Sequence, residues 1–230
     1  IQTPQGFQKD LFKEAHQKAY DEKYLGTDDV SLVEHLGQPV HIVSGDYCNI
    51  KVTTPNDIAV AKRYLGIEDK RMRVGFGYDI HQLKAGRPCI LGGVHIESDL
   101  GPDGHSDADV LIHALMDAML GAAGLRDIGY YFPPEDDQYK GISSMLLLEK
   151  VNFLLKERGL QAYNIDIMVI SETPKLKPHI DMMKANLQSI LEIPLDRISI
   201  KATTNEMLGA IGRREGIAAQ AVVSVYEGEI

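Results

Sequence analysis

The chain has 230 residues, of which 44% are hydrophobic and 25% charged, and its formal charge is -9. This composition is typical of a globular protein with one large or two small domains, and the acidic balance excludes a broad nucleic-acid interface, which needs clustered Lys and Arg. Cys48 and Cys89 lack the spacing of a thiolate metal site or a disulfide framework. No apolar stretch reaches the roughly 20 residues of a membrane span, and the start IQTPQGFQKD lacks the apolar run of a signal peptide. We therefore expect a cytoplasmic protein that binds neither nucleic acid nor membrane.

The first 70 residues predict helices separated by a β-rich segment. LFKEAHQKAYDEKY carries apolar and aromatic residues at helical spacing, and TDDVSLVEHLG predicts a second helix, capped by Thr27 or Asp28 and ended by Gly37. PVHIVSG and YCNIKVTTP are β-rich, and DIAVAKRYLG predicts another helix, which ends at Gly66. The charged stretch near IEDKRMR places a domain boundary between about residues 67 and 72, giving domains 1–70 and 71–230.

The second domain alternates strands with helices, but some strands also follow one another directly. Strands are predicted over 72–81, around CILGGVHI, and in YNIDIMVIS, RISIKATT and AAQAVVSVYE. Helices are predicted over about 107–121 and in SSMLLLEKVNFLLKERG and PHIDMMKANLQSILE. This order favours an α+β fold, with a mixed β-sheet that has helices on one face.

A metal site is the first functional prediction. Asp79 and His81 in GYDIHQL are two apart on a predicted strand, so their side chains point the same way. Asp109, His113 and Asp117 are four apart on the predicted helix and share a face. A solvated polar face is the alternative explanation of the helix residues if they stand alone, and a lone His113 is more often a core histidine than a ligand. Together with the strand pair, the nitrogen and oxygen ligands suit zinc with an open fourth position.

Residues next to that helix suit a phosphate and a sugar. Ser106 or Asp107 is the expected N-cap, and the amides near His105 and Ser106 suit either a phosphate or simple capping. Asp127 and Gly129 lie in a turn-rich loop whose carboxylate could bind hydroxyl groups, although surface turns often carry Asp.

Three later segments give weaker signals. In KATTNEMLG, Thr203 and Thr204 point to opposite faces if extended, and Glu206 could hold magnesium. Arg213 and Arg214 in GRREG suit an anion or a solvated turn. SETPKLKP is a proline-stiffened loop that could expose backbone groups to a base.

Six segments, taken in order, resemble the 2-C-methyl-D-erythritol 2,4-cyclodiphosphate synthases of the non-mevalonate isoprenoid pathway. They are VGFGYDIHQL, LGGVHI, GHSDADVLIHALMDAMLGAAGLRDIGYYFP, YKG, PKLKPHI and KATTNEMLGAIGRREGIAAQAV. The resemblance runs from about residue 72 to 228. Three earlier segments resemble the C-terminal part of 2-C-methyl-D-erythritol 4-phosphate cytidylyltransferase, and they are QTPQGF, TDDVSLVEHLG and NIKVTTPNDIAVAKRYLG. The resemblance implies that the first domain is part of a Rossmann-like α/β domain. A bifunctional fusion enzyme joins these two activities.

The resemblance implies a chorismate-mutase-like fold, a homotrimer with active sites between subunits, and a reaction that releases CMP as a cyclic diphosphate closes. It implies zinc on Asp79, His81 and His113, and magnesium or manganese on Glu206. It assigns transition-state stabilisation to His105 and Thr204, and it gives Asp109 and Asp117 supporting or packing roles. An isoprenoid diphosphate on the trimer axis near Arg213 is also implied, although Ala210 stands where an aromatic residue can line that axis. The implied substrate contacts are Ser106, Asp127, Gly129, Phe132, Asp136, Thr203 and Arg213, together with the cytosine loop from Ser171 through Lys175 to Lys177.

The resemblance also limits what the first domain can do. The glycine-rich nucleotide loop and the first catalytic lysine of the cytidylyltransferases have no counterpart in this sequence, and Lys51 alone matches a substrate-positioning lysine. We therefore expect no cytidylyltransferase activity from this chain.

Two other functions fit the same residues. A zinc hydrolase would use the open zinc position to activate water and would cleave a phosphate ester. A noncatalytic trimeric scaffold would hold a structural zinc with four protein ligands, but the sequence offers no evident fourth ligand near Asp79 or His113.

Overall fold

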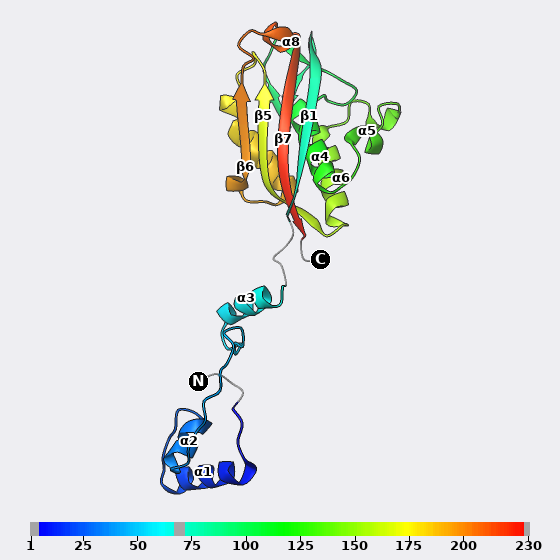
Figure 1. Cartoon of the computed structure of the whole chain (residues 1–230). Coiled ribbons are helices and arrows are strands. Elements are labelled where there is room, and N and C mark those ends of the chain that lie inside the picture. The colour runs from blue at the N-terminus through cyan, green and yellow to red at the C-terminus, as the bar shows by residue number, and fades with distance from the viewer. Residues whose placement is uncertain (1–4, 67–71, 228–230) are drawn as a thin grey trace. The chain divides into compact units, whose positions relative to one another are not determined.

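The computed structural model describes residues 5–66 and 72–227. The chain divides into two compact units, Ile1–Asp69 and Lys70–Ile230, and Figure 1 shows the elements of both. None of the helices in the described residues has the length and apolar character needed to span a membrane.

The described part of the first unit is helical. Its helices are α1 (Lys9–Asp21), α2 (Asp29–His35) and α3 (Pro55–Tyr64). Capping boxes at Asp28 and Thr54 start α2 and α3, because each side chain accepts a hydrogen bond from the backbone N–H three residues later. Helices α1 and α2 pack together and bury four small or branched residues, namely Ala15, Ala19, Val30 and Val33.

The β-rich prediction for PVHIVSG and YCNIKVTTP was wrong, because neither segment forms a strand. Ile42 and Val43 are 93% and 83% exposed. A strand satisfies its N–H and C=O groups through a neighbouring strand, and residues 5–66 contain no strand that could pair with these segments. The α/β character expected of this fragment is therefore absent from its described residues.

The second unit is built on a mixed five-stranded sheet, as predicted. The strand order is β4-β1-β7-β5-β6, in which β5 and β6 are parallel and the other neighbours are antiparallel. A two-stranded hairpin lies apart from this sheet. The strands are β1 (Met72–Ala85), β2 (Cys89–Leu91), β3 (Val94–Ile96), β4 (Leu100–Asp103), β5 (Leu160–Ile170), β6 (Ile198–Thr203) and β7 (Gly216–Glu227).

Three long helices cover one face of the sheet, as Figure 1 shows. They are α4 (Val110–Ala122), α6 (Ser144–Lys156) and α7 (Ile180–Leu191). The core lies between these helices and the inward residues of the strands, which alternate with outward ones as the pleat requires. Short elements fill the connections: α5 (Ile128–Tyr131), α8 (Gly209–Gly212) and the 3₁₀ turns Asp137–Tyr139, Lys177–His179 and Leu195–Arg197.

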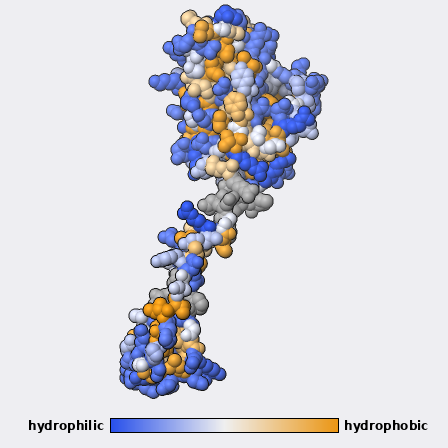
Figure 2. All heavy atoms as spheres, viewed as in Figure 1, coloured by the Kyte–Doolittle hydropathy of each residue, from blue (hydrophilic) through white to orange (hydrophobic). Residues whose placement is uncertain are grey.

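No helix of the described residues covers the other face of the sheet, which carries an apolar stripe. Figure 2 shows hydrophobic side chains running over this side of the second unit. Four consecutive outward residues of β1 are uncharged and between 46% and 67% exposed, and they are Val74, Phe76, Tyr78 and Ile80. Monomeric proteins rarely expose a contiguous apolar surface of this kind unless something binds it.

Candidate metal centre and active site

Asp79 and His81 lie on one face of β1, as the strand alternation predicts, and that face is the one toward α4. The inward positions before them are Gly75 and Gly77, which let α4 pack unusually close to the strand. Oδ2 of Asp79 lies 2.9 Å from Nδ1 of His81. Two potential ligands of different chemistry therefore stand side by side at the inner face of the sheet.

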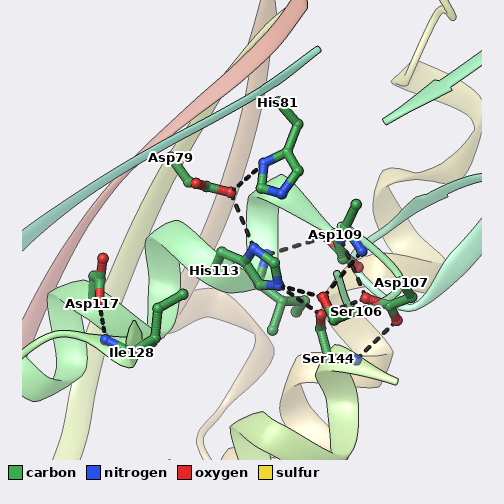
Figure 3. A network of polar contacts seen from close by, with 11 residues as sticks. Asp79, His81, Ser106, Asp107, Asp109, His113, Asp117, Ile128 and Ser144 are labelled. Carbon is green, nitrogen blue, oxygen red and sulfur yellow. Dashed lines mark hydrogen bonds and ion pairs between the residues drawn. The ribbon is translucent and has the colours of Figure 1, made fainter. Parts of the chain in front are cut away.

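His113 completes the cluster from the first half of α4. Its Nδ1 lies 3.1 Å from the same Oδ2 of Asp79, and its ring centroid is 5.3 Å from that of His81. Figure 3 shows Asp79 between the two imidazoles. One ligand atom from each of the three residues falls within 4.8 Å of the others, so the cluster could hold a metal ion.

The donor set and its surroundings fit a cation. Nδ1 of His81 is buried and has no hydrogen-bond partner of good geometry in the described part of the chain, despite its short distance to Asp79. Burial opposes the negative charge of Asp79, but the hydrogen bond to His113 and the neighbouring His81 lower the pKa of Asp79 to about 2. An ionised carboxylate with two imidazole nitrogens is a common three-ligand zinc set.

A second layer of polar groups holds the far side of the His113 ring. Nε2 of His113 lies 3.1 Å from Oγ of Ser106 and 3.0 Å from Oγ of Ser144, the first residue of α6. Ser144 is in turn bound by Asp107 through both its backbone N–H and its hydroxyl. Ser144 was not predicted from the sequence, and no local pattern reveals it because it lies 31 residues from His113.

The expected N-cap was wrong by two or three residues. The helix starts at Val110, and its N-cap is Asp109, whose carboxylate accepts a hydrogen bond from the N–H of Ile112. Ala108 has a positive φ of 58°, which breaks the helical conformation just before the cap. Asp109 also accepts from the N–H of Gly93, and burial raises the pKa of Asp109 to about 6.

Asp117 supports the loop that carries Asp127 and Gly129. Its Oδ1 accepts a hydrogen bond from the N–H of Ile128 at 2.8 Å and so fastens α5 to α4. Asp127 is the N-cap of this single turn, and Phe132 ends it. Gly129 therefore lies in a short helical turn, and Asp136 caps the 3₁₀ turn that follows.

His105 lies on the turn next to the metal cluster. A Cβ added at the preceding Gly104 would stand 2.7 Å from Nε2 of His81, so the turn packs directly against that ring. Nε2 of His105 itself is buried and has no hydrogen-bond partner among the described residues. An unsatisfied buried donor or acceptor of this kind is costly in an apolar setting and suits a ligand group.

The other group of predicted site residues lies at the end of β6. Thr203 is the last residue of that strand, and the hydroxyl of Thr204 donates to Glu206 at 3.0 Å. Glu172, which the sequence analysis did not single out, accepts from the backbone N–H groups of Asn205 and Met207 at 2.9 and 3.1 Å. The backbone of Ser171 donates to Thr203, so the predicted cytosine loop starts beside the Glu206 turn.

The structure does not bring these two groups together within one chain. Three strand spacings separate β1 from β6 in the sheet, which amounts to roughly 14 Å. Arg213 is paired with Glu215 at 2.8 Å and exposed. Lys51, Lys175 and Lys177 are also exposed.

Comparison with known proteins identifies both parts of the chain. The YgbB family model matches residues 72–226, and the model for 2-C-methyl-D-erythritol 4-phosphate cytidylyltransferase matches residues 1–67. The 2-C-methyl-D-erythritol 2,4-cyclodiphosphate synthase of Synechococcus elongatus is 59% identical over 152 residues, which are 66% of this chain and 95% of that protein. The bifunctional enzyme IspD/IspF of Desulforudis audaxviator is 50% identical over 98% of this chain, but the chain spans only 57% of that relative.

Solved structures agree with the sequence relatives. The bifunctional IspDF from Campylobacter jejuni matches all of this chain and 60% of its own, with a TM-score of 0.68 and 36% identity. A 2C-methyl-D-erythritol-2,4-cyclodiphosphate synthase in a CDP-bound form matches 66% of this chain and 98% of its own, with a TM-score of 0.61 and 38% identity. These matches confirm the resemblance expected from the motifs. The chain therefore belongs to the YgbB family of cyclodiphosphate synthases through residues 72–226, and it carries a cytidylyltransferase-like segment ahead of them.

Proposed function

We propose that the second unit, residues 71–230, converts 4-diphosphocytidyl-2-C-methyl-D-erythritol 2-phosphate to 2-C-methyl-D-erythritol 2,4-cyclodiphosphate and CMP. The observation that carries this proposal is the cluster of Asp79, His81 and His113 within a YgbB-family domain. In this reaction an oxygen of the 2-phosphate bonds to the β-phosphorus, and the bond from that phosphorus to the bridging oxygen of CMP breaks. The substrate supplies both nucleophile and leaving group, so the protein needs no nucleophile of its own and acts by positioning and charge stabilisation.

Zinc is the metal that we assign to the cluster, with magnesium or manganese on Glu206. When bound, these ions would neutralise charge on the diphosphate and favour the in-line arrangement of attacking and leaving oxygens. The lowered pKa of Asp79 supports this assignment, because that carboxylate is ionised at neutral pH.

The remaining site residues have positioning roles in this proposal. His105 and Thr204 donate hydrogen bonds to phosphate oxygens in the transition state, and the buried unpaired Nε2 of His105 is available for that purpose. Ser106 contacts the substrate. Asp127 and Gly129 bind the diol from the turn that Asp117 fastens. Phe132, Asp136 and Thr203 line the substrate, and the loop from Ser171 to Lys177 holds the cytosine.

A homotrimer with active sites between subunits accounts for two features of the second unit. The zinc cluster and the Glu206 turn lie three strand spacings apart in one chain, and a second copy would bring such groups to one substrate. The uncovered apolar stripe on β1 supplies a surface for that association. In this assembly Arg213 lies near the axis, where we place the isoprenoid diphosphate.

We also propose that residues 1–70 are the C-terminal part of a cytidylyltransferase domain and lack that activity by themselves. Their described part offers three helices and an exposed Lys51, and it has no glycine-rich loop for a nucleotide. Formation of the CDP-alcohol from CTP and methylerythritol phosphate by the purified chain would contradict this part of the proposal.

Phosphorus NMR tests the reaction directly. The purified chain is incubated with zinc, magnesium and 4-diphosphocytidyl-2-C-methyl-D-erythritol 2-phosphate. Two coupled diphosphate resonances that appear together with CMP are the expected result. Free phosphate or acyclic products would indicate a hydrolase instead, and an unchanged spectrum from folded, metal-loaded protein would indicate a noncatalytic scaffold.

A further inference from the structure

We propose that Arg87 is a positioning residue for the reaction, because its guanidinium holds the backbone that presents His105 to the substrate. The inference rests on the transition-state role proposed for His105, and it adds a residue on which that role depends. Arg87 lies in the connection between β1 and β2, and its polar contacts are with residues 102–104 at the end of β4. Residues 102–105 are called the His105 segment below.

The backbone of Arg87 packs against β4. The carbonyl oxygens of Arg87 and Pro88 lie so near Gly101 that a Cβ added there would stand 2.3 Å from each of them. Glycine leaves room for this close approach of two backbone segments. The side chain of Arg87 therefore starts beside the strand that leads directly into the His105 segment.

The guanidinium of Arg87 contacts three consecutive residues of the His105 segment. Its Nη2 donates to the carbonyl oxygen of Gly104 at 3.1 Å, and its Nε lies 3.5 Å from the carbonyl oxygen of Pro102 and 3.4 Å from Oδ1 of Asp103. A guanidinium carries its N–H donors in a rigid plane, so one side chain reaches acceptors on several residues at once. The bond to Gly104 is the strongest of the three, because the other two distances are long for hydrogen bonds.

The bond to Gly104 controls the backbone on the N-terminal side of His105. The carbonyl of Gly104 and the N–H of His105 belong to one planar peptide group, so a bond to the first fixes the orientation of the second. On the other side of His105, its own carbonyl accepts the N–H of Gly141 at 2.8 Å. Because both peptide planes that flank His105 are held, the direction of its Cα–Cβ bond is set.

No regular secondary structure provides this orientation. β4 ends at Asp103 and α4 starts at Val110, so His105 lies in a connection between them. Nε2 of His105 is buried and has no hydrogen-bond partner in the part of the chain that the structure describes. The position of this nitrogen therefore depends on the backbone that carries the ring. A displacement of about 1 Å at a group that acts on the substrate can cost about 100-fold in rate.

A simple ion pair with Asp103 is the competing explanation for Arg87. Lys84 provides the matched control, because its Nζ pairs with Oδ2 of the same carboxylate. Within the described residues, the side chain of Lys84 binds no carbonyl of the His105 segment. Lys84→Ala therefore removes an ion pair of Asp103 and leaves the carbonyl contacts in place. Arg87→Lys does the reverse, because it keeps a positive charge near Asp103 but loses the planar set of donors.

Steady-state kinetics of the full chain loaded with zinc and magnesium give the first test. We expect Arg87→Ala and Arg87→Lys to lower kcat by about 10- to 100-fold with little change in KM, since His105 acts in the transition state. Lys84→Ala should keep the wild-type kcat. In a His105→Ala background, Arg87→Ala should cost nothing further, because no His105 ring is left to position. Full activity of Arg87→Lys, equal losses in Lys84→Ala and Arg87→Ala, or additive losses in the double variant would each overturn the proposal.

Zinc content separates His105 from the neighbouring metal site. Gly104 also packs against the ring of His81, so the zinc bound per chain is measured in every variant. We expect the wild-type zinc content in Arg87→Ala. A loss of zinc in parallel with the loss of kcat would overturn the assignment to His105, because the effect would then run through His81.

A readout without turnover separates this proposal from the proposed function. In the metal-free full chain labelled with carbon-13 in its histidines, the NMR signals of the His105 ring are assigned by their loss in His105→Gln. We expect these signals to shift in Arg87→Ala and Arg87→Lys and to keep their wild-type positions in Lys84→Ala. Unchanged signals in both Arg87 variants would overturn the proposal, and Arg87→Lys decides it if Arg87→Ala does not fold. A wild-type chain without cyclase activity would defeat the proposed function, whereas these shifts would still decide whether Arg87 holds the His105 segment.

Discussion

The Cα of Gly77 lies so close to the backbone carbonyl of Ala114 that a Cβ added at Gly77 would stand 2.0 Å from the carbonyl oxygen. Gly77 precedes Asp79 by two residues on β1, and Ala114 follows His113 on α4. The contact therefore sets the distance between the strand that supplies two of the predicted zinc ligands and the helix that supplies the third.

Gly77→Ala should separate α4 from β1. The new methyl group meets backbone atoms that cannot rotate away, so we expect the free energy of unfolding to fall by about 1–3 kcal/mol and zinc affinity to fall with it. Gly121→Ala is the control, because Gly121 lies on the same helix and its added Cβ would have only an oxygen at 3.9 Å nearby. That change should stabilise the helix by up to about 1 kcal/mol. Chemical denaturation and chelator competition measure both effects, and similar behaviour of the two variants would argue against the close contact.

Gly104→Ala should disturb the His81 ring first, although its Cβ would also stand 3.0 Å from Cβ of Ala108. Its Cβ would lie 2.7 Å from Nε2 of that imidazole, and the ring can move away because it ends a side chain. We expect about a tenfold or greater loss of zinc affinity with little change in the unfolding temperature of the metal-free chain. His81→Ala gives the upper limit of the effect. Unchanged zinc affinity in Gly104→Ala would mean that His81 tolerates a different ring position.

Glu172 should control the turn that carries Glu206. Its carboxylate holds the N–H groups of Asn205 and Met207, and both Glu206 and Met207 have positive φ values, of 50° and 63°. Glu172→Ala removes two charge-assisted hydrogen bonds from a strained turn, so we expect a roughly 10- to 100-fold higher magnesium requirement for turnover.

The zinc content of Glu172→Ala should stay at the wild-type value, because Glu172 lies at the β6 side of the sheet. Glu172→Gln keeps an acceptor oxygen for both N–H groups and should restore most of the activity. Turnover measured against magnesium concentration, together with zinc stoichiometry, separates these outcomes. A parallel loss of zinc in Glu172→Ala would point to a disruption that reaches beyond the Glu206 turn.

Asp109 should make stability depend on pH. Burial raises the pKa of its carboxyl group from 3.8 to about 6 in the folded chain. A raised carboxyl pKa means that the folded state holds the proton more tightly, so this contribution to stability is complete below about pH 4 and is lost as the pH rises through about 6. Relative to Asp109→Asn, the wild type should lose up to about 3 kcal/mol across that window.

Urea denaturation of the metal-free wild type and of Asp109→Asn at several pH values checks this prediction. The difference between the two curves reports on Asp109 together with the two groups that its charge reaches, His113 and Cys89. A difference that is independent of pH would contradict a buried carboxyl group that ionises near pH 6.

The site residues that could be predicted from the sequence lie on elements with a regular side-chain repeat, which is every second residue in a strand and every fourth residue on one face of a helix. Asp79 and His81 were predicted on one face because a strand alternates, and His113 because it stands on a helix of clear periodicity. Ser144 and Glu172 were not predicted, since their contacts join residues 37 and 33 positions apart and depend on how helices and loops pack. The N-cap at Asp109 was also missed, because a positive φ at Ala108 has no signature in the residue type.

In the first unit the same dependence on distant partners made a predicted element fail to form. Ile42 and Val43 have strong β propensity, yet they form no strand in the described residues, because propensity becomes a strand only beside a partner. The helices there were predicted well, since a helix satisfies its own backbone hydrogen bonds.

The strand order has a genetic consequence. With the zinc cluster on β1 and the Glu206 turn after β6, each chain contributes one half of two different catalytic centres in the proposed trimer. His113→Ala and Glu206→Ala subunits, each inactive alone, should then complement one another when they are unfolded and refolded together. On random mixing, about a quarter of the head-to-tail interfaces would pair two intact halves. Two defective alleles expressed in one cell would behave as a partly functional enzyme.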